Sequence, residues 1–123
     1  MGINSTEVAY SFGQLGSAFN DGAALMKPPT GKVFVAITFL ADTVFDASGG
    51  LVADTTNTST EGLEYAGTEA AAHNLSDGSE TAISGSGGLQ IDASNTFPKG
   101  VTIYGRYTEI DLTSGMCIAY IGD

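Results

Sequence analysis

Two side chains of the kind that act as catalytic nucleophiles or bases occur only once each in the 123-residue sequence. His73 follows a run of alanines, and the partners of a Ser-His-Asp arrangement would have to come from distant segments that nothing in the sequence indicates. Cys117 lies between Met116 and Ile118 in an apolar run, without the neighbouring positive charge that lowers a thiol pKa. We therefore expect a surface or interface histidine, a structural cysteine and no enzymatic activity.

The carboxylates do not form a recognisable metal motif. Asp77-Gly78-Ser79-Glu80 with Asp92 could supply oxygen ligands to calcium, but the alternating acidic positions and closing Glu of an EF-hand loop are missing. The glycine-rich stretch 85–88 lacks the Lys-Ser/Thr pair that follows a phosphate-binding loop. A single cysteine excludes an internal disulfide and a zinc site built on paired thiolates. We expect no metal and no cofactor.

Arg106 stands between two tyrosines, Tyr104 and Tyr107. A guanidinium in this position can stack on a ring or pair with a carboxylate such as Glu109 or Asp111. In a chain with four cations, this favours a structural or intersubunit clamp formed by Tyr104, Arg106 and Tyr107. A ligand-binding role is the alternative.

The charge of the chain limits its partners. Fourteen acidic residues against four basic ones give a net charge of −10, and the four cations are scattered along the sequence. Binding a phosphate backbone or an anionic membrane surface relies on clustered Lys and Arg. The sequence also lacks a run of 18 apolar residues, which a spanning helix needs. We therefore expect neither a nucleic-acid partner nor a membrane partner.

The elements that would position these residues are strands. Residues 32–40 are apolar on both faces, with Val33, Val35, Ile37 and Phe39 on one side. Residues 100–112 predict a strand whose apolar positions change phase, with a bulge at Gly105. Residues 116–121 predict a buried strand, which the turn at Thr113-Ser114-Gly115 would join to the preceding one as a hairpin. The chain is predicted to be all-β, a small β-sandwich or jelly-roll-like domain.

The first 29 residues predict a different kind of segment. Their apolar side chains are interspersed with glycines, which disfavours a helix, and Pro28-Pro29 ends the stretch. We predict two parts: an extended N-terminal arm over residues 1–29, with short pieces of structure, and a β domain over residues 30–123. Within the arm, Phe12, Leu15 and Phe19 are the predicted contacts with a neighbouring molecule.

Two stretches carry a resemblance to a known group. Residues 28–37 with 41–45, and residues 100–107 through 118–122 with the sequence Tyr104-Gly105-Arg106-Tyr107, resemble segments of small structural proteins of marine tailed phages. Where the group usually has Trp after Gly-Arg, Tyr107 stands here. The resemblance brings no catalytic residues with it.

The resemblance implies a virion structural protein, and first of all a capsid decoration (cement) protein on the outer surface of the head. Its partners would be the major capsid protein and further copies of this chain, with a homotrimer favoured, because a small domain with strands apolar on both faces needs additional burial. The alternative is a tail or fibre component that binds a host-surface glycan.

Overall fold

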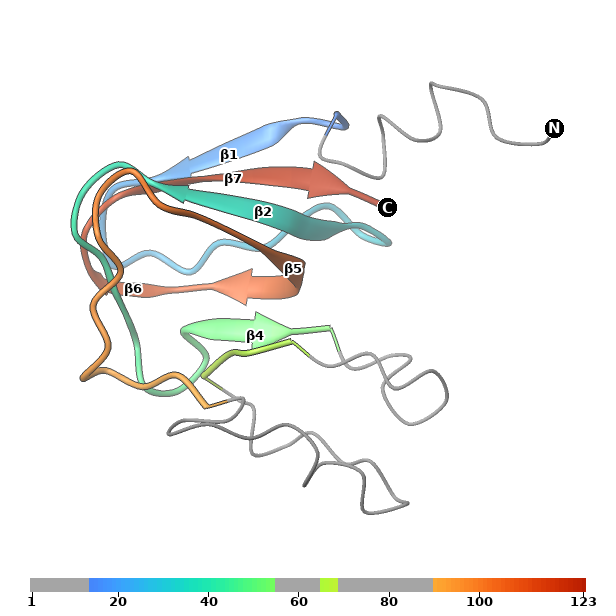
Figure 1. Cartoon of the computed structure of the whole chain (residues 1–123). Coiled ribbons are helices and arrows are strands. Elements are labelled where there is room, and N and C mark those ends of the chain that lie inside the picture. The colour runs from blue at the N-terminus through green and yellow to red at the C-terminus, as the bar shows by residue number, and fades with distance from the viewer. Residues whose placement is uncertain (1–13, 55–64, 69–89) are drawn as a thin grey trace, which may run out of the picture.

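The structure is a computed structural model in which residues 14–54, 65–68 and 90–123 are described (Figure 1). Among these residues there is no helix, and all regular structure is antiparallel strand, so the predicted all-β class is confirmed. The seven strands are β1 (Ser17–Asn20), β2 (Val33–Phe39), β3 (Val44–Phe45), β4 (Leu51–Ala53), β5 (Thr102–Ile110), β6 (Leu112–Ser114) and β7 (Cys117–Gly122).

Five of these strands form one sheet in the order β1-β7-β2-β5-β4, and β3 pairs with β6 in a second, two-stranded sheet. The chain passes from the larger sheet to the smaller one at Asp111, between β5 and β6. Buried side chains from both sheets form a single core, in which Phe45 and Leu112 of the small sheet join Phe34, Ile37 and Phe39 of the large one. The specific jelly-roll connectivity stays a prediction.

The predicted hairpin between the last two long strands is wrong. β2 lies between β5 and β7 and pairs with both of them. Residues 112–114, which the sequence suggested as the end of a strand and a tight turn, form β6 instead and pair with β3. The reason is burial: β2 is apolar on both faces, and a strand of that kind is most stable in the middle of a sheet.

The central strand β2 is buried along its length except for Thr38, as the apolar pattern predicts. The side chains do not simply alternate between its two faces as predicted, because the register of β2 against β7 shifts by one residue between Phe34 and Ala36. The extra residue there is Val35, and it brings Phe34 onto the same side as Ile37 and Phe39, in the core.

β5 has two register shifts, which divide it into two halves. Against β2 the shift falls between Tyr104 and Tyr107, the interval that contains Gly105, where the bulge was predicted. Against β4 a second shift falls between Tyr107 and Glu109. The short β4 pairs only with the second half of the strand, Tyr107–Ile110.

The described part of the predicted arm lies in the large sheet. β1 pairs with β7, and the Leu15 amide donates to the Ile121 carbonyl at 3.2 Å. Further along, the backbone groups of Met26 and Ile110 exchange two hydrogen bonds of 2.8 and 2.9 Å. Phe12 lies outside the described residues.

Candidate interaction surface

One side of the large sheet presents two cross-strand rows of uncharged side chains. The side chains of β7 show which side of the sheet this is. Cys117 and Ala119 are buried in the core, so the alternate residues Ile118 and Tyr120 point to the opposite side. Strand pairing continues each row through four strands. We call this set the outer face; its rows are Ser17, Tyr120, Ala36, Tyr104 and Phe19, Ile118, Thr38, Thr102.

The outer face carries exposed aromatic rings. Tyr104 is 75% exposed and Phe19 is 55% exposed, although 85 residues separate them in the sequence. Between them, Thr38 and Thr102 join through their hydroxyls at 2.8 Å. No charged residue stands in either row, so the outer face can be dehydrated by a partner without burying an ionised group.

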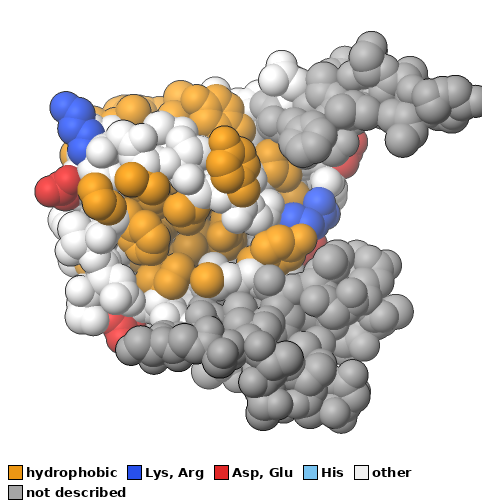
Figure 2. Space-filling model, in the orientation of Figure 1, with side chains coloured by type: hydrophobic (Ala, Val, Ile, Leu, Met, Phe, Trp, Pro, Cys, Tyr) orange, Lys and Arg blue, Asp and Glu red, His pale blue; other side chains and the backbone are white. Residues whose placement is uncertain are grey.

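Figure 2 shows hydrophobic side chains over much of the described part of one view of the molecule, with charged side chains near the margins. Val101 and Leu40 are also partly exposed, at 40% and 37%. Exposed apolar groups that gather into a patch are typical of a protein–protein contact site.

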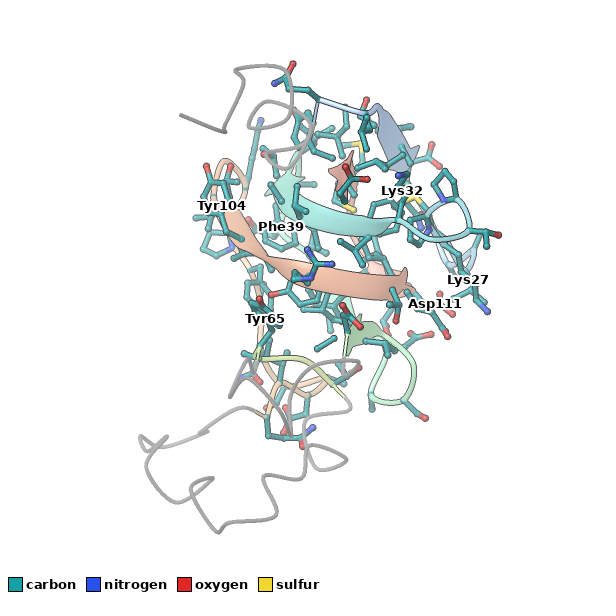
Figure 3. The ribbon with its side chains drawn as sticks, turned by 90° about the vertical axis from the view of Figure 1, so that its right-hand side faces the viewer. Lys27, Lys32, Phe39, Tyr65, Tyr104 and Asp111 are labelled. Carbon is teal, nitrogen blue, oxygen red and sulfur yellow. The ribbon has the colours of Figure 1, made fainter. Side chains whose placement is uncertain are left out.

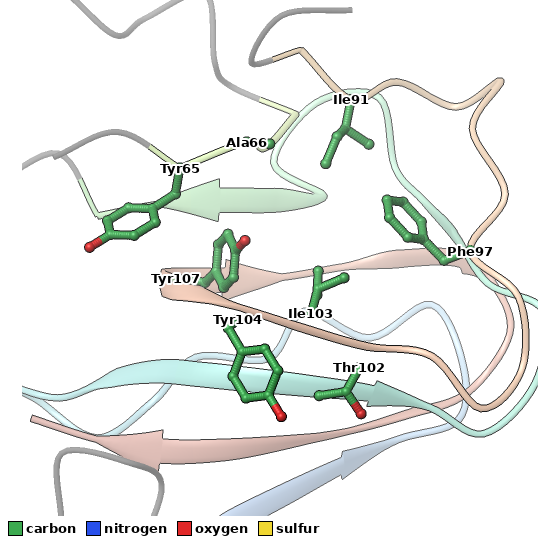
Figure 4. Close-up of a pocket in the computed structure, with 8 residues that line it drawn as sticks. All are labelled: Tyr65, Ala66, Ile91, Phe97, Thr102, Ile103, Tyr104 and Tyr107. Atoms are coloured by element: carbon green, nitrogen blue, oxygen red, sulfur yellow. The ribbon is translucent and has the colours of Figure 1, made fainter. Parts of the chain in front are cut away.

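A cavity of about 540 Å³ opens beside the first half of β5 (Figure 4). Ile103 and Tyr107 point into it from the inner side of the strand, whereas Thr102 and Tyr104 point to the other side of β5. Tyr65, Ile91 and Phe97 face them across the cavity. The complete lining is Tyr65, Ala66, Ile91, Phe97, Thr102, Ile103, Tyr104 and Tyr107.

The inner wall of this cavity is closely packed. The Tyr107 ring lies against Gly105, where a Cβ atom would come within 2.7 Å of it, and its centroid is 6.5 Å from that of Tyr65. Burial, with a smaller contribution from Tyr65, raises the pKa of Tyr107 to about 12. At the far end Phe97 stacks on Phe39 at 5.1 Å and meets Phe45 edge-on at 5.4 Å. The cavity is therefore bounded by neutral aromatic side chains.

The three residues of the predicted clamp have separate surroundings. Arg106 pairs with Asp54 at 3.3 Å and donates to the backbone oxygen of Asp123 at 2.6 Å. Its carboxylate partner is thus Asp54 rather than Glu109 or Asp111. Tyr107 is buried in the core. Tyr104 is exposed (Figure 3). Arg106 therefore ties β5 to the segment after β4 and to the residue after β7.

The predicted contact residues are placed unequally. Phe19 lies in the outer face, Leu15 is half-buried beside β7, and Phe12 is outside the described residues, as are His73 and the acidic and glycine-rich stretches at 77–80 and 85–88. Cys117 is buried, and burial raises the pKa of its thiol to about 11. The sequence reasoning missed the cavity, because Tyr65, Ile91 and Phe97 come from segments without a strand pattern.

Within residues 14–54, 65–68 and 90–123, no three side chains of His, Cys, Asp or Glu gather as metal ligands would. The same residues contain no helix long and apolar enough to cross a membrane. No protein-family model, no curated protein and no solved structure matches the chain.

Proposed function

We propose that the chain is a phage virion structural protein, a decoration (cement) protein that binds the outside of the capsid and stabilises the shell. The observation that carries the proposal is the uncharged outer face, where Phe19 and Tyr104 stand exposed on one side of a four-strand platform. An uncharged surface with exposed aromatic rings on a small β domain is suited to adhesion by contact area.

The charge of the chain agrees with this location. A protein of net charge −10 would be repelled by packaged DNA, whereas the solvent side of a shell imposes no such repulsion. The resemblance of residues 28–37 with 41–45, and of residues 100–107 through 118–122, to structural proteins of marine tailed phages supports the same location. The partners would be the major capsid protein and other copies of this chain, with a trimer favoured.

The test is binding of purified protein to undecorated capsids, measured by co-sedimentation. Phe19→Ser and Tyr104→Ser, each made alone, are expected to weaken binding at least tenfold, because exposed aromatic side chains that become buried in an interface carry much of its binding free energy. Ala47→Ser is the control: Ala47 is exposed on the loop between β3 and β4, outside the large sheet. Equal binding by all three variants and the wild type would contradict the role of the outer face.

A second candidate, a tail or fibre module that binds a host-surface glycan, is favoured by one observation. Tyr65 lines the cavity beside β5, Tyr104 is exposed on the other side of the same strand, and aromatic rings with polar tips suit stacking against sugars. Quantitative mass spectrometry of virions separates the two. Hundreds of copies per particle indicate decoration, and a few to a few dozen indicate a tail component.

A further inference from the structure

The first half of β5 has an open backbone edge. The Val101 carbonyl accepts from the Phe39 amide at 3.0 Å, so the backbone groups of Val101 and Ile103 point toward β2. Those of the alternate residues Thr102 and Tyr104 therefore point the other way. Among the described residues no strand pairs on that side, since β4 begins its pairing at Tyr107. Such an edge is a template for another extended segment.

The apolar cavity adjoins this open edge. A strand added beside Thr102–Tyr104 would direct alternate side chains to the two sides of the sheet. Those on the inner side would enter the space between Ile103, Ile91 and Phe97, and those on the outer side would lie next to Tyr104. The edge supplies backbone hydrogen bonds, and the cavity supplies a place for an apolar or aromatic side chain.

The chain itself contains a segment with the required pattern. In residues 8–12, Val8, Tyr10 and Phe12 alternate with Ala9 and Ser11, the period of a strand with one apolar face. The segment carries no charge, so it can enter an apolar cavity without burying an ionised group. These residues lie outside the described ones.

Residues 8–12 of the same molecule cannot lie along this edge as a strand. Leu15 is fixed at the opposite end of the sheet by its hydrogen bond to Ile121. Phe12 is three residues earlier and therefore at most about 11 Å away. A strand added beyond β5 would be four strand spacings from β1, about 19 Å. The arm that fits must come from a second copy.

We infer that residues 8–12 of one copy add as a strand to the open edge of β5 in another copy, with Tyr10 or Phe12 in the cavity. This is a head-to-tail exchange, in which the arm and the acceptor edge are different surfaces of each subunit. Such contacts form a closed ring when the rotation between subunits permits it, as in a trimer. The inference does not depend on a capsid partner.

The exchange can be mapped by photo-crosslinking in the full-length protein. Tyr10 is replaced by a photoreactive phenylalanine analogue, and equal amounts of ¹⁵N-labelled and unlabelled protein are unfolded, refolded together and irradiated. Trypsin then releases residues 100–106 as a separate peptide, because Lys99 and Arg106 bracket it. The expected product joins the N-terminal peptide of one isotope to peptide 100–106 of the other. An intermolecular crosslink to another cavity-lining residue, such as Phe97 or Ile91, would also agree with the inference. Crosslinks confined to one isotope, or absent from every peptide that lines the cavity, would overturn it.

Sedimentation velocity supplies an independent measurement on the same full chain. Tyr10→Asp is expected to weaken self-association at least tenfold, because the cavity would have to accept an ionised carboxylate. Asn4→Asp adds the same charge to the arm outside residues 8–12 and is expected to leave self-association unchanged. A wild-type protein that is monomeric at all accessible concentrations, or equal effects of the two substitutions, would contradict the exchange. Circular dichroism confirms that each variant is folded.

Discussion

The two halves of β5 share one strand but have opposite surroundings. Residues 107–110 are paired on both sides. On one side Tyr107 pairs with β2 and Ile110 with Met26, and on the other side β4 pairs with the whole stretch. The side chains of Tyr107 and Ile110 lie in the core. Residues 102–106 are paired with β2, and among the described residues no further strand covers their other side at Thr102–Tyr104. The closed half holds the two sheets together, whereas the open half presents Tyr104, a cavity and an unpaired edge. The core contacts and the exposed side chain of the proposed contact surface are thus separated along a single strand.

The largest change in the free energy of unfolding is expected when one side chain in the closed half is truncated. Ile110 is completely buried, pairs with Leu51 of β4 and contacts the core. Ile110→Ala should lower the free energy of unfolding by about 2–5 kcal/mol, from lost burial and the remaining cavity. Urea denaturation measures the change.

The matched variant in the open half is Tyr104→Ala. Tyr104 is 75% exposed, so its truncation should change the free energy of unfolding by less than about 0.5 kcal/mol. If the two variants were equally destabilised, the division of β5 into a half that supports the core and an exposed half would be wrong.

Gly105 lies between the two halves, and its substitution is expected to give the next largest loss of stability. A Cβ atom there would lie within 2.7 Å of the Tyr107 ring, so Gly105→Ala must displace the ring from the cavity wall. We expect a loss of about 1–3 kcal/mol in the free energy of unfolding, as for other overpacked sites. Thermal melting followed by tyrosine fluorescence measures both the loss and the altered ring environment.

Gly22→Ala is the control for this substitution. An added Cβ atom at Gly22 would have no heavy atom within 4 Å, and the residue has no positive φ. Its stability should stay within about 0.5 kcal/mol of wild type. A similar loss in both variants would mean that a general effect of replacing glycine, rather than contact with Tyr107, sets the boundary.

The contrast between the halves also explains what the sequence could predict. β2 and β7 are long apolar runs, and their strands follow from local pattern alone. The phase change between Ile103 and Ile110 was visible too, and with it the need for a register shift near Gly105. The sequence could not reveal that β2 lies between β5 and β7, because this order depends on which strands compete for a central position.

The candidate surface was predictable only in fragments. Phe19 and Tyr104 were each identified, but their common face depends on two intervening strands, β7 and β2. The cavity depends on Tyr65, Ile91 and Phe97, which come from segments too short or too polar to show a period. Arg106 was expected beside Glu109 or Asp111, since neighbours in sequence are the natural candidates. Asp54 reaches it through the pairing of β4 with β5, which no local pattern specifies.

A smaller effect is expected at Arg106 itself, next to the bulge. Its guanidinium contacts Asp54 and the backbone oxygen of Asp123 in different directions, and a lysine ammonium cannot keep both contacts in the same geometry. Arg106→Lys should lower the free energy of unfolding by less than about 1 kcal/mol, because the pair is partly exposed. Repeating the denaturation in 1 M NaCl should shrink the difference. A difference that persists in salt would assign the effect to packing of the arginine side chain instead.

The smallest expected change in the free energy of unfolding is a gain, and it concerns Asp111, the residue that follows the closed half. Burial, followed by the neighbouring Asp46 and Glu109, raises the pKa of this carboxyl, and its Oδ1 atom is buried without a hydrogen-bond partner in the structure. A carboxyl whose pKa is higher in the folded state destabilises that state when ionised. The penalty is absent below the unfolded pKa of about 3.9 and is complete above the folded pKa. Asp111→Asn should therefore stabilise the protein at pH 7, by less than about 1 kcal/mol. In thermal melts from pH 3.5 to pH 7, the gain in melting temperature of the variant over wild type should grow as the pH rises. A gain that is constant or shrinks over this range would mean that the ionised carboxylate does not destabilise the folded state.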